Sequence, residues 1–178
     1  MTDPTPTPDE HAAEILAFWE AARHRAGVVR TSVVTGLGVS AAMVPQTWSF
    51  GDNPELAEQL LDLVLSGEKT GTATALAEFT HADEPMPVRG DLSIVLDSAG
   101  RPRALLRTTE VATVPFSEVS EEHAAAEGED DRTLASWRRE HEKYWRRVLE
   151  PLGEQFSDDL PVVTERFELL YPRPGDRG

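Results

Sequence analysis

The stretch Ser66-Gly67-Glu68-Lys69-Thr70-Gly71-Thr72-Ala73-Thr74 is the most informative part of the sequence. It places one cation, three threonines and two glycines within nine residues. Lys69 stands out because only two of the 17 Lys and Arg residues are lysines. A lysine amine can lose its proton when it is desolvated, and it can then act as a base or a nucleophile, which a guanidinium cannot do. The stretch therefore indicates a functional turn, and a solvated lysine in a threonine-rich strand is the simpler alternative.

The segment before this stretch has the pattern of a packed helix. Asn53 is a good N-cap, Pro54 suits the first helical position, and Gly67 is a typical residue just after a helix end. Apolar residues at helical spacing form one stripe, made of Leu56, Leu60, Leu61 and Val64. Lys69 is therefore expected at the exit of a helix that the core holds firmly, and residues 70–76 are expected to be extended.

The remaining elements alternate between helices and strands. We expect helices over 9–25, 117–123 and from about 133 to 149, and a helical turn over 75–79. We expect strands over 91–96, 104–114 and 161–171, the first two joined by the turn at 97–100. Segment 28–47 is read as a connection. This pattern predicts an α+β fold in which helices pack on a small, mostly antiparallel sheet.

The last of these helices carries aromatic and apolar side chains on one face. They are Leu134, Trp137, His141, Tyr144, Trp145 and Val148. Such a stripe either packs in a hydrophobic core or stacks on nucleobases. Helical spacing favours the core.

Composition limits the possible function. The net charge is −15, and a protein that coats duplex nucleic acid normally presents a basic face that neutralises phosphates. We therefore expect no extended duplex partner, and any nucleic-acid site should read one or a few nucleotides. The chain has no Cys, no apolar run of about 18 residues and no basic start of a signal peptide. We expect a cytoplasmic protein with no membrane partner.

Two parts of the sequence can be combined into a reactive site. One is Lys69 with Thr72, and the other is the acidic segment 118–131, which contains Glu127. A desolvated Lys amine could take the proton of the Thr hydroxyl, which then attacks an acyl carbon, while the Glu orients the Lys or passes a proton to the leaving nitrogen. In a flat strand Lys69 and Thr72 point to opposite faces, so convergence needs a bend, which Gly71 would permit.

A metal site is the weaker interpretation. The five histidines do not follow a metal-binding spacing, although His123, Glu127 and His141 could supply three ligands if they meet. We expect neither a metal nor another cofactor.

At this point the sequence resembles the ASCH domain family (activating signal cointegrator homology), and it looks closest to the larger bacterial members. Seven pieces occur in family order. They are Trp48–Asp52, Ala57–Leu60 through Leu65–Thr74, Gly90-Asp91, Arg107–Val111, Pro115–Val119, Glu127–Trp137 and Glu165–Phe167. The resemblance is carried chiefly by the Gly-x-Lys-Thr piece together with the Glu-Gly-Glu-x-Asp piece.

The resemblance implies a PUA-like fold, a small β-barrel with flanking helices and a cleft beside the Gly-x-Lys motif. It also implies a domain at 48–171. The prolines of residues 1–8 predict a disordered tail, and an N-terminal helical extension with its connection is expected at 9–47. Residues 172–178 would form a C-terminal tail.

The resemblance also implies an association with RNA. Small bacterial relatives are amidohydrolases that remove the acyl group of N4-acetylcytidine with a Lys, a Thr and a Glu, which correspond to Lys69, Thr72 and Glu127. Larger relatives are described as ribonucleases that use the same Lys and a hydroxyl, here Thr133. The substrate-binding part of the site is expected to comprise Thr70, Arg107, Glu129, Arg132 and Thr133.

The sequence is therefore compatible with three functions. The first is amide hydrolysis on a small N4-acylated nucleoside or nucleotide, which suits an acidic surface. The second is cleavage of short single-stranded RNA, in which Lys69 with Arg107 or Arg132 would stabilise the phosphorane charge. The third is a module that binds RNA or protein without catalysis. A site with Lys69 as its only cation favours a nucleoside, whereas converging arginines favour phosphate.

Overall fold

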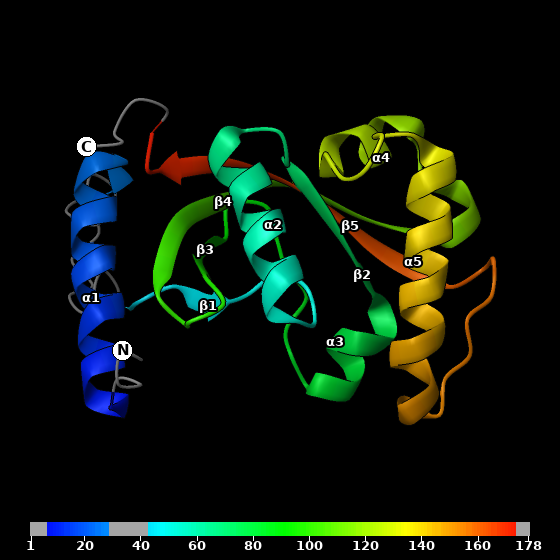
Figure 1. The fold of residues 1–178 in the computed structure, drawn as a ribbon, viewed down its shortest axis with the longest axis horizontal. Coiled ribbons are helices and arrows are strands. Elements are labelled where there is room, and N and C mark those ends of the chain that lie inside the picture. Colours follow the sequence, from blue (N-terminus) through cyan, green and yellow to red (C-terminus); the bar gives the residue numbers. More distant parts are fainter. Residues whose placement is uncertain (1–6, 29–42, 174–178) are drawn as a thin grey trace. The chain divides into compact units, whose positions relative to one another are not determined.

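The computed structural model describes residues 7–28 and 43–173 (Figure 1). Its helices are α1 (Pro8–Arg25), α2 (Pro54–Ser66), α3 (Leu76–Ala82), α4 (Glu121–Glu127) and α5 (Leu134–Leu149), with two 3-10 turns, η3 (Phe116–Glu118) and η4 (Glu150–Leu152). Its strands are β1 (Gln46–Trp48), β2 (Gly71–Ala75), β3 (Leu92–Leu96), β4 (Pro102–Pro115) and β5 (Pro161–Tyr171). The predicted α+β class is confirmed. Most of the predicted tail 1–8, most of the connection 28–47 and the end of the predicted C-terminal tail lie outside the described residues.

The strands form one sheet with the order β1-β3-β4-β5-β2. β1 pairs with β3 in parallel, which the sequence pattern did not indicate, and β2 pairs with β5 in the antiparallel direction. The register of the second pair sets Thr72 opposite Glu165 and Ala73 opposite Thr164. In this order β2 is an edge strand, so the segment that carries the Lys69 motif enters the sheet at its margin.

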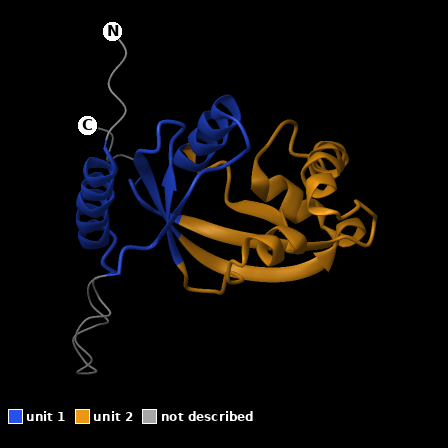
Figure 2. Cartoon of the chain, turned by 90° about the horizontal axis from the view of Figure 1, so that it is seen from below, with its two compact units in different colours: residues 1–65, 92–106, 169–178 blue, residues 66–91, 107–168 orange. Residues whose placement is uncertain are grey.

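The chain divides into two compact units (Figure 2). Unit 1 comprises residues 1–65, 92–106 and 169–178, and unit 2 comprises residues 66–91 and 107–168. Every candidate site residue named above belongs to unit 2. The geometry of the candidate site can therefore be described within one unit.

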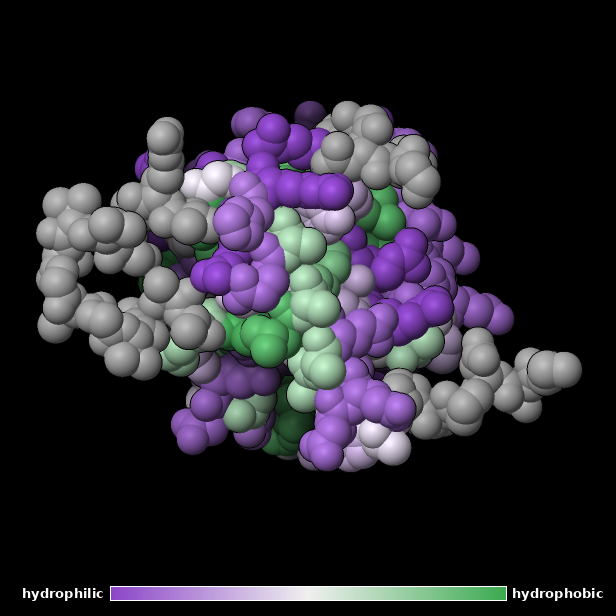
Figure 3. Space-filling model, turned by 90° about the vertical axis from the view of Figure 1, so that its left-hand side faces the viewer, coloured by the Kyte–Doolittle hydropathy of each residue, from purple (hydrophilic) through white to green (hydrophobic). Residues whose placement is uncertain are grey.

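The core of unit 1 joins α1 to strand residues. Trp19 and Ala22 of α1 are buried with Ile94 and Leu105, and the ring of Phe18 packs edge-on against Tyr171 at 5.5 Å. The neighbouring aromatic residues Phe18 and Trp19 thus pack α1 within this unit. The view from the α1 side shows both hydrophilic and apolar residues at the surface, and Leu16 of α1 remains 48% exposed (Figure 3). Among the described residues, no helix combines the length and apolar composition needed to cross a bilayer.

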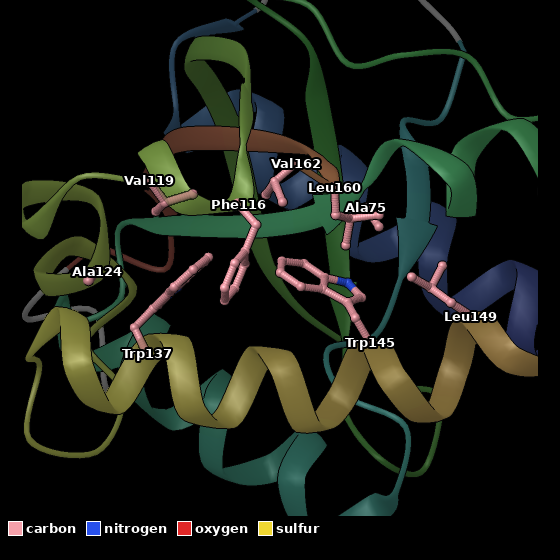
Figure 4. Close-up of a cluster of buried hydrophobic side chains, with 9 residues drawn as sticks. All are labelled: Ala75, Phe116, Val119, Ala124, Trp137, Trp145, Leu149, Leu160 and Val162. Atoms are coloured by element: carbon pink, nitrogen blue, oxygen red, sulfur yellow. The ribbon is translucent and has the colours of Figure 1, made fainter. Parts of the chain in front are cut away.

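The core of unit 2 is built on the aromatic stripe of α5. Trp145 is fully buried, Trp137 is nearly so, and the ring of Phe116 lies between the two indoles (Figure 4). Phe116 stacks on Trp137 at 5.5 Å and meets Trp145 edge-on at 5.9 Å. Ala73 and Ala75 of β2 pack against the same cluster. The interpretation of the stripe as core is therefore confirmed, and the core fixes one face of β2.

This packing predicts that Trp145→Ala lowers the free energy of unfolding by about 3–5 kcal/mol, because a large buried side chain leaves a cavity. Urea denaturation followed by circular dichroism would measure the change. Lys143→Ala on the same helix is the control, since its ammonium is exposed and its loss should change stability by less than about 0.5 kcal/mol. Equal effects of the two substitutions would contradict this description of the core.

Candidate functional site

Lys69 is buried between two carboxylates. Its side chain is only 1% exposed, and its Nζ lies 3.1 Å from Glu127 Oε2 and 2.6 Å from Glu129 Oε1. The Nζ also donates to the backbone carbonyl of Glu127 at 3.4 Å. Lys69 lies between the end of α2 and the start of β2, as the sequence predicted, and Gly67 adopts the positive φ of 82° that ends a helix. The structure therefore brings together three of the predicted site residues.

The backbone around Glu127 packs directly on the Lys69 turn. The amide of Thr70 donates to the Ala126 carbonyl at 2.7 Å, and the Thr70 hydroxyl donates to the same oxygen at 3.3 Å. Gly128 has a φ of 72°, and a Cβ added there would lie 2.5 Å from the Glu68 carbonyl oxygen. Only a glycine fits both constraints. The end of α4 is thus held against the start of β2.

Glu127 has further partners, and sequence reasoning did not assign the Trp137 indole among them. Its Oε1 accepts from Trp137 Nε1 at 2.7 Å, and it lies 3.1 Å from His123 Nε2 and 3.6 Å from His141 Nε2. His123 and Glu127 are four residues apart in α4, which is the spacing of neighbours on one helix face. The indole donor could not be inferred, because Trp137 was explained by its place in the core.

Charge pairing outweighs burial in this cluster. Burial favours the neutral amine of Lys69, but the charges of Glu127 and Glu129 overcome it and raise the pKa of Lys69 above its ordinary value. Burial likewise disfavours the carboxylate of Glu127, but Lys69 and the neighbouring histidines hold the pKa of Glu127 well below its usual range. The ammonium and the carboxylate are therefore both charged at neutral pH. Lys69 in this arrangement is a hydrogen-bond donor rather than a base.

The histidines and Glu127 do meet, as the metal interpretation required. However, the carboxylate oxygen that faces them already accepts from the Trp137 indole. Within residues 7–28 and 43–173, no group of three potential ligands has the arrangement of a metal site. The contacts describe a hydrogen-bonded ionic cluster around one carboxylate.

We predict that Glu127→Gln lowers the free energy of unfolding by about 3–5 kcal/mol, because it breaks a buried ion pair. The depressed pKa of Glu127 adds stability above its unfolded value near 4.5, and this contribution is lost as the pH falls through the lower folded value. The variant should therefore lose less stability than the wild type on acidification. Urea denaturation at neutral and acidic pH would measure both effects.

Glu140→Gln is the control for this experiment, since Glu140 is a half-exposed carboxylate whose ion pairs with Arg139 and Lys143 lie at the surface of α5. If the stability of Glu127→Gln falls on acidification as much as that of the wild type, other groups dominate the loss of stability at low pH.

Thr72 lies on the other side of β2 from the α5 core. Ala73 and Ala75 pack on that core, and the Cβ direction of Gly71 leads to His123 Cε1 at 3.4 Å. Since side chains alternate along a strand, Thr72 belongs to the opposite face, where Glu165 is its cross-strand neighbour. Lys69 precedes the strand, so this alternation does not determine the direction of its side chain.

The other predicted binding residues are distributed around the cluster. Glu129 keeps 28% of its side chain exposed, and the guanidinium of Arg132 donates to the Glu68 carbonyl at 3.3 Å. Arg107 is exposed and pairs with Glu168 at 2.5 Å. Thr133 is the N-cap of α5: its hydroxyl accepts from the Ser136 amide and donates to Asp131 at 2.7 Å.

A second polar group was not anticipated from the sequence. Glu165 is partly buried, and its Oε2 accepts from the Thr108 hydroxyl at 3.4 Å. Burial and the nearby charge of Asp91 raise the pKa of Glu165, against the smaller opposing effect of the Thr108 hydrogen bond. A carboxyl with a raised pKa is a frequent feature of functional sites.

Comparison with known proteins identifies the family of this chain. The family model of the ASCH domain matches residues 46–171, which is well over half of the chain. The chain belongs to the ASCH domain family. The resemblance inferred from the sequence motifs is therefore confirmed, and with it the PUA-like fold that is general in this family, whose members typically bind RNA.

Two solved structures are similar to this ASCH protein over most of its length. The ASCH domain from Lactobacillus crispatus JV V101 has 28% identity and a TM-score of 0.74, and the match covers 89% of this chain and 95% of that one. Protein EF3133 from Enterococcus faecalis V583 has 31% identity and a TM-score of 0.74, with coverage of 94% and 97%. None of the curated proteins matches this chain.

Proposed function

We propose that this ASCH protein binds a nucleoside, or a nucleotide of short single-stranded RNA, and hydrolyses an N-acyl amide on a cytidine-type base. The observation that carries the proposal is the buried set of Lys69, Glu127 and Glu129 beside the edge strand β2. The proposal also rests on the family resemblance, which assigns the catalytic roles to Lys69, Thr72 and Glu127.

Glu129 is the member of this set that a ligand can displace. Glu127 is buried and held by Lys69, His123 and Trp137, whereas Glu129 is partly exposed. If the acyl oxygen of a substrate replaces the Glu129 carboxylate at Lys69 Nζ, the ammonium can stabilise the oxyanion of the tetrahedral intermediate. Glu127 would keep Lys69 charged and in place during this exchange.

The proposed reaction has two stages. The Thr72 hydroxyl oxygen bonds to the acyl carbon as its proton leaves, and the tetrahedral intermediate expels the exocyclic nitrogen of the base, which takes up a proton. Water then hydrolyses the acyl-threonine ester and releases the acid.

The charge distribution favours a small neutral substrate over long RNA. The net charge is −15, and Arg107 is already paired with Glu168. The Thr133 hydroxyl, which the ribonuclease alternative would use, serves as a helix cap. These observations support amide hydrolysis over RNA cleavage, and a module that only binds its ligand is the remaining alternative.

We predict that the wild type releases cytidine from N4-acetylcytidine and that Thr72→Val abolishes this release. Valine keeps the β-branched shape of threonine but removes the attacking hydroxyl, so the melting temperature should change little. Chromatography of the reaction products would measure turnover. The matched control is Thr74→Val, because Thr74 lies two residues further along the same face of β2 and should retain activity.

Other outcomes would redirect the proposal. No cytidine from the wild type, together with measurable cytidine binding, would support the binding module. Fragments from a short single-stranded RNA that persist in Thr133→Ser and disappear in Thr133→Val would favour the ribonuclease. Retained activity in Thr72→Val would contradict the assignment of the nucleophile.

A further inference from the structure

Four polar residues from separate motif pieces meet on the face of the unit 2 sheet that carries Thr72. Glu165 is directly opposite Thr72 in the β2–β5 register, and Thr108 of β4 donates to Glu165. Asp91 joins the group through the backbone, because its carbonyl accepts from the Thr108 amide at 2.9 Å. Of these four residues, the proposed reaction uses only Thr72.

The register sets Thr72 beside Glu165 on one face of the sheet. Directly opposed residues of an antiparallel pair have Cβ atoms about 4.5–5.5 Å apart and lie on the same face. A Glu side chain spans this distance easily. Thr108 donates to the carboxyl from β4, the other strand next to β5.

Folding alone does not account for the carboxyl of Glu165. In the part of the chain that the structure describes, its one hydrogen bond is the 3.4 Å contact from Thr108, and no ion pair involves it. A partly buried carboxylate without a cation is unfavourable, and here the charge of Asp91 adds repulsion. A glutamine would fit the same space without a charge, so the ionisable group calls for a functional explanation.

The proposed reaction lacks one participant that Glu165 can provide. The Thr72 hydroxyl must lose a proton as it attacks, and Lys69 already carries its own. We propose that Glu165 is the catalytic base that accepts the Thr72 proton. This inference rests on the proposed amide hydrolysis.

Glu165 alone can accept and return every proton that the proposed reaction moves. Glu165 takes the proton when the Thr72 oxygen bonds to the acyl carbon, and it returns that proton to the exocyclic nitrogen when the C–N bond breaks. In the second stage it takes a proton from the attacking water and returns it to the Thr72 oxygen as the ester bond breaks. Glu165 is thus a carboxylate at the start and at the end of each turnover.

The first test compares Glu165→Gln and Glu165→Asp with the wild type on N4-acetylcytidine across pH. A base of this kind contributes about 10²–10⁴-fold to the rate, so Glu165→Gln should lower kcat by that factor with a much smaller change in KM. The wild-type kcat should rise with pH through the pKa of Glu165, which lies above its ordinary value of 4.5. This rise of kcat with pH should be absent in Glu165→Gln. It should remain in Glu165→Asp, which should keep partial activity.

The matched control is Glu168→Gln on the same strand, where the carboxylate is exposed and paired with Arg107. It should keep both the rate and the pH profile. The wild type could be active while Glu165→Gln keeps both its kcat and the rise of kcat with pH. This result would overturn the role of Glu165 and leave the proposed hydrolysis intact.

A second measurement decides the Thr72–Glu165 contact without any turnover. The carboxyl 13C signal of Glu165, assigned as the one missing in Glu165→Gln, would be followed through a pH titration by NMR. A hydroxyl that donates to the carboxylate lowers its pKa, so Thr72→Val should raise the pKa of Glu165, whereas Thr74→Val should not. An inactive wild type would refute the proposed function, and an unchanged pKa in Thr72→Val would refute the role of Glu165 whether or not the substrate reacts.

Discussion

The ion pair of Lys69 with Glu127 is the interaction on which the candidate site depends. It joins the turn that starts β2 to the end of α4, two segments that are distant in sequence. Each partner would be unfavourable alone in this buried position, and each is accommodated only because the other is charged. The pair therefore couples the fold of unit 2 to the ionisation of two side chains, and the Trp137 indole connects it to the hydrophobic core.

Two polar clusters near the edge strand β2, one around Lys69 and one around Glu165, divide the proposed chemistry between them. In the first cluster the charges are paired and fixed, which suits the stabilisation of a developing oxyanion. In the second cluster Glu165 has a single weak hydrogen bond, which suits a group that gains and loses a proton.

Local patterns in the sequence predicted most of the elements but few of their pairings. Asn53 and Pro54 identified the start of α2, because caps act within one turn of a helix. The Lys69–Glu127 contact was proposed from residue chemistry and from family motifs, because no local spacing relates two residues this far apart in sequence. Glu165 was missed as a functional residue because its neighbours come from β2 and β4, and no local signal encodes the register between distant strands.

The division of the chain into units has a consequence for how the molecule evolves and folds. Each unit is assembled from separate segments, and β4 and β5 each begin in one unit and end in the other. No single cut releases the Lys69 and Glu165 clusters as an independent piece of chain. The half of the chain that carries these clusters is therefore not a contiguous segment that could move between proteins without residues of unit 1.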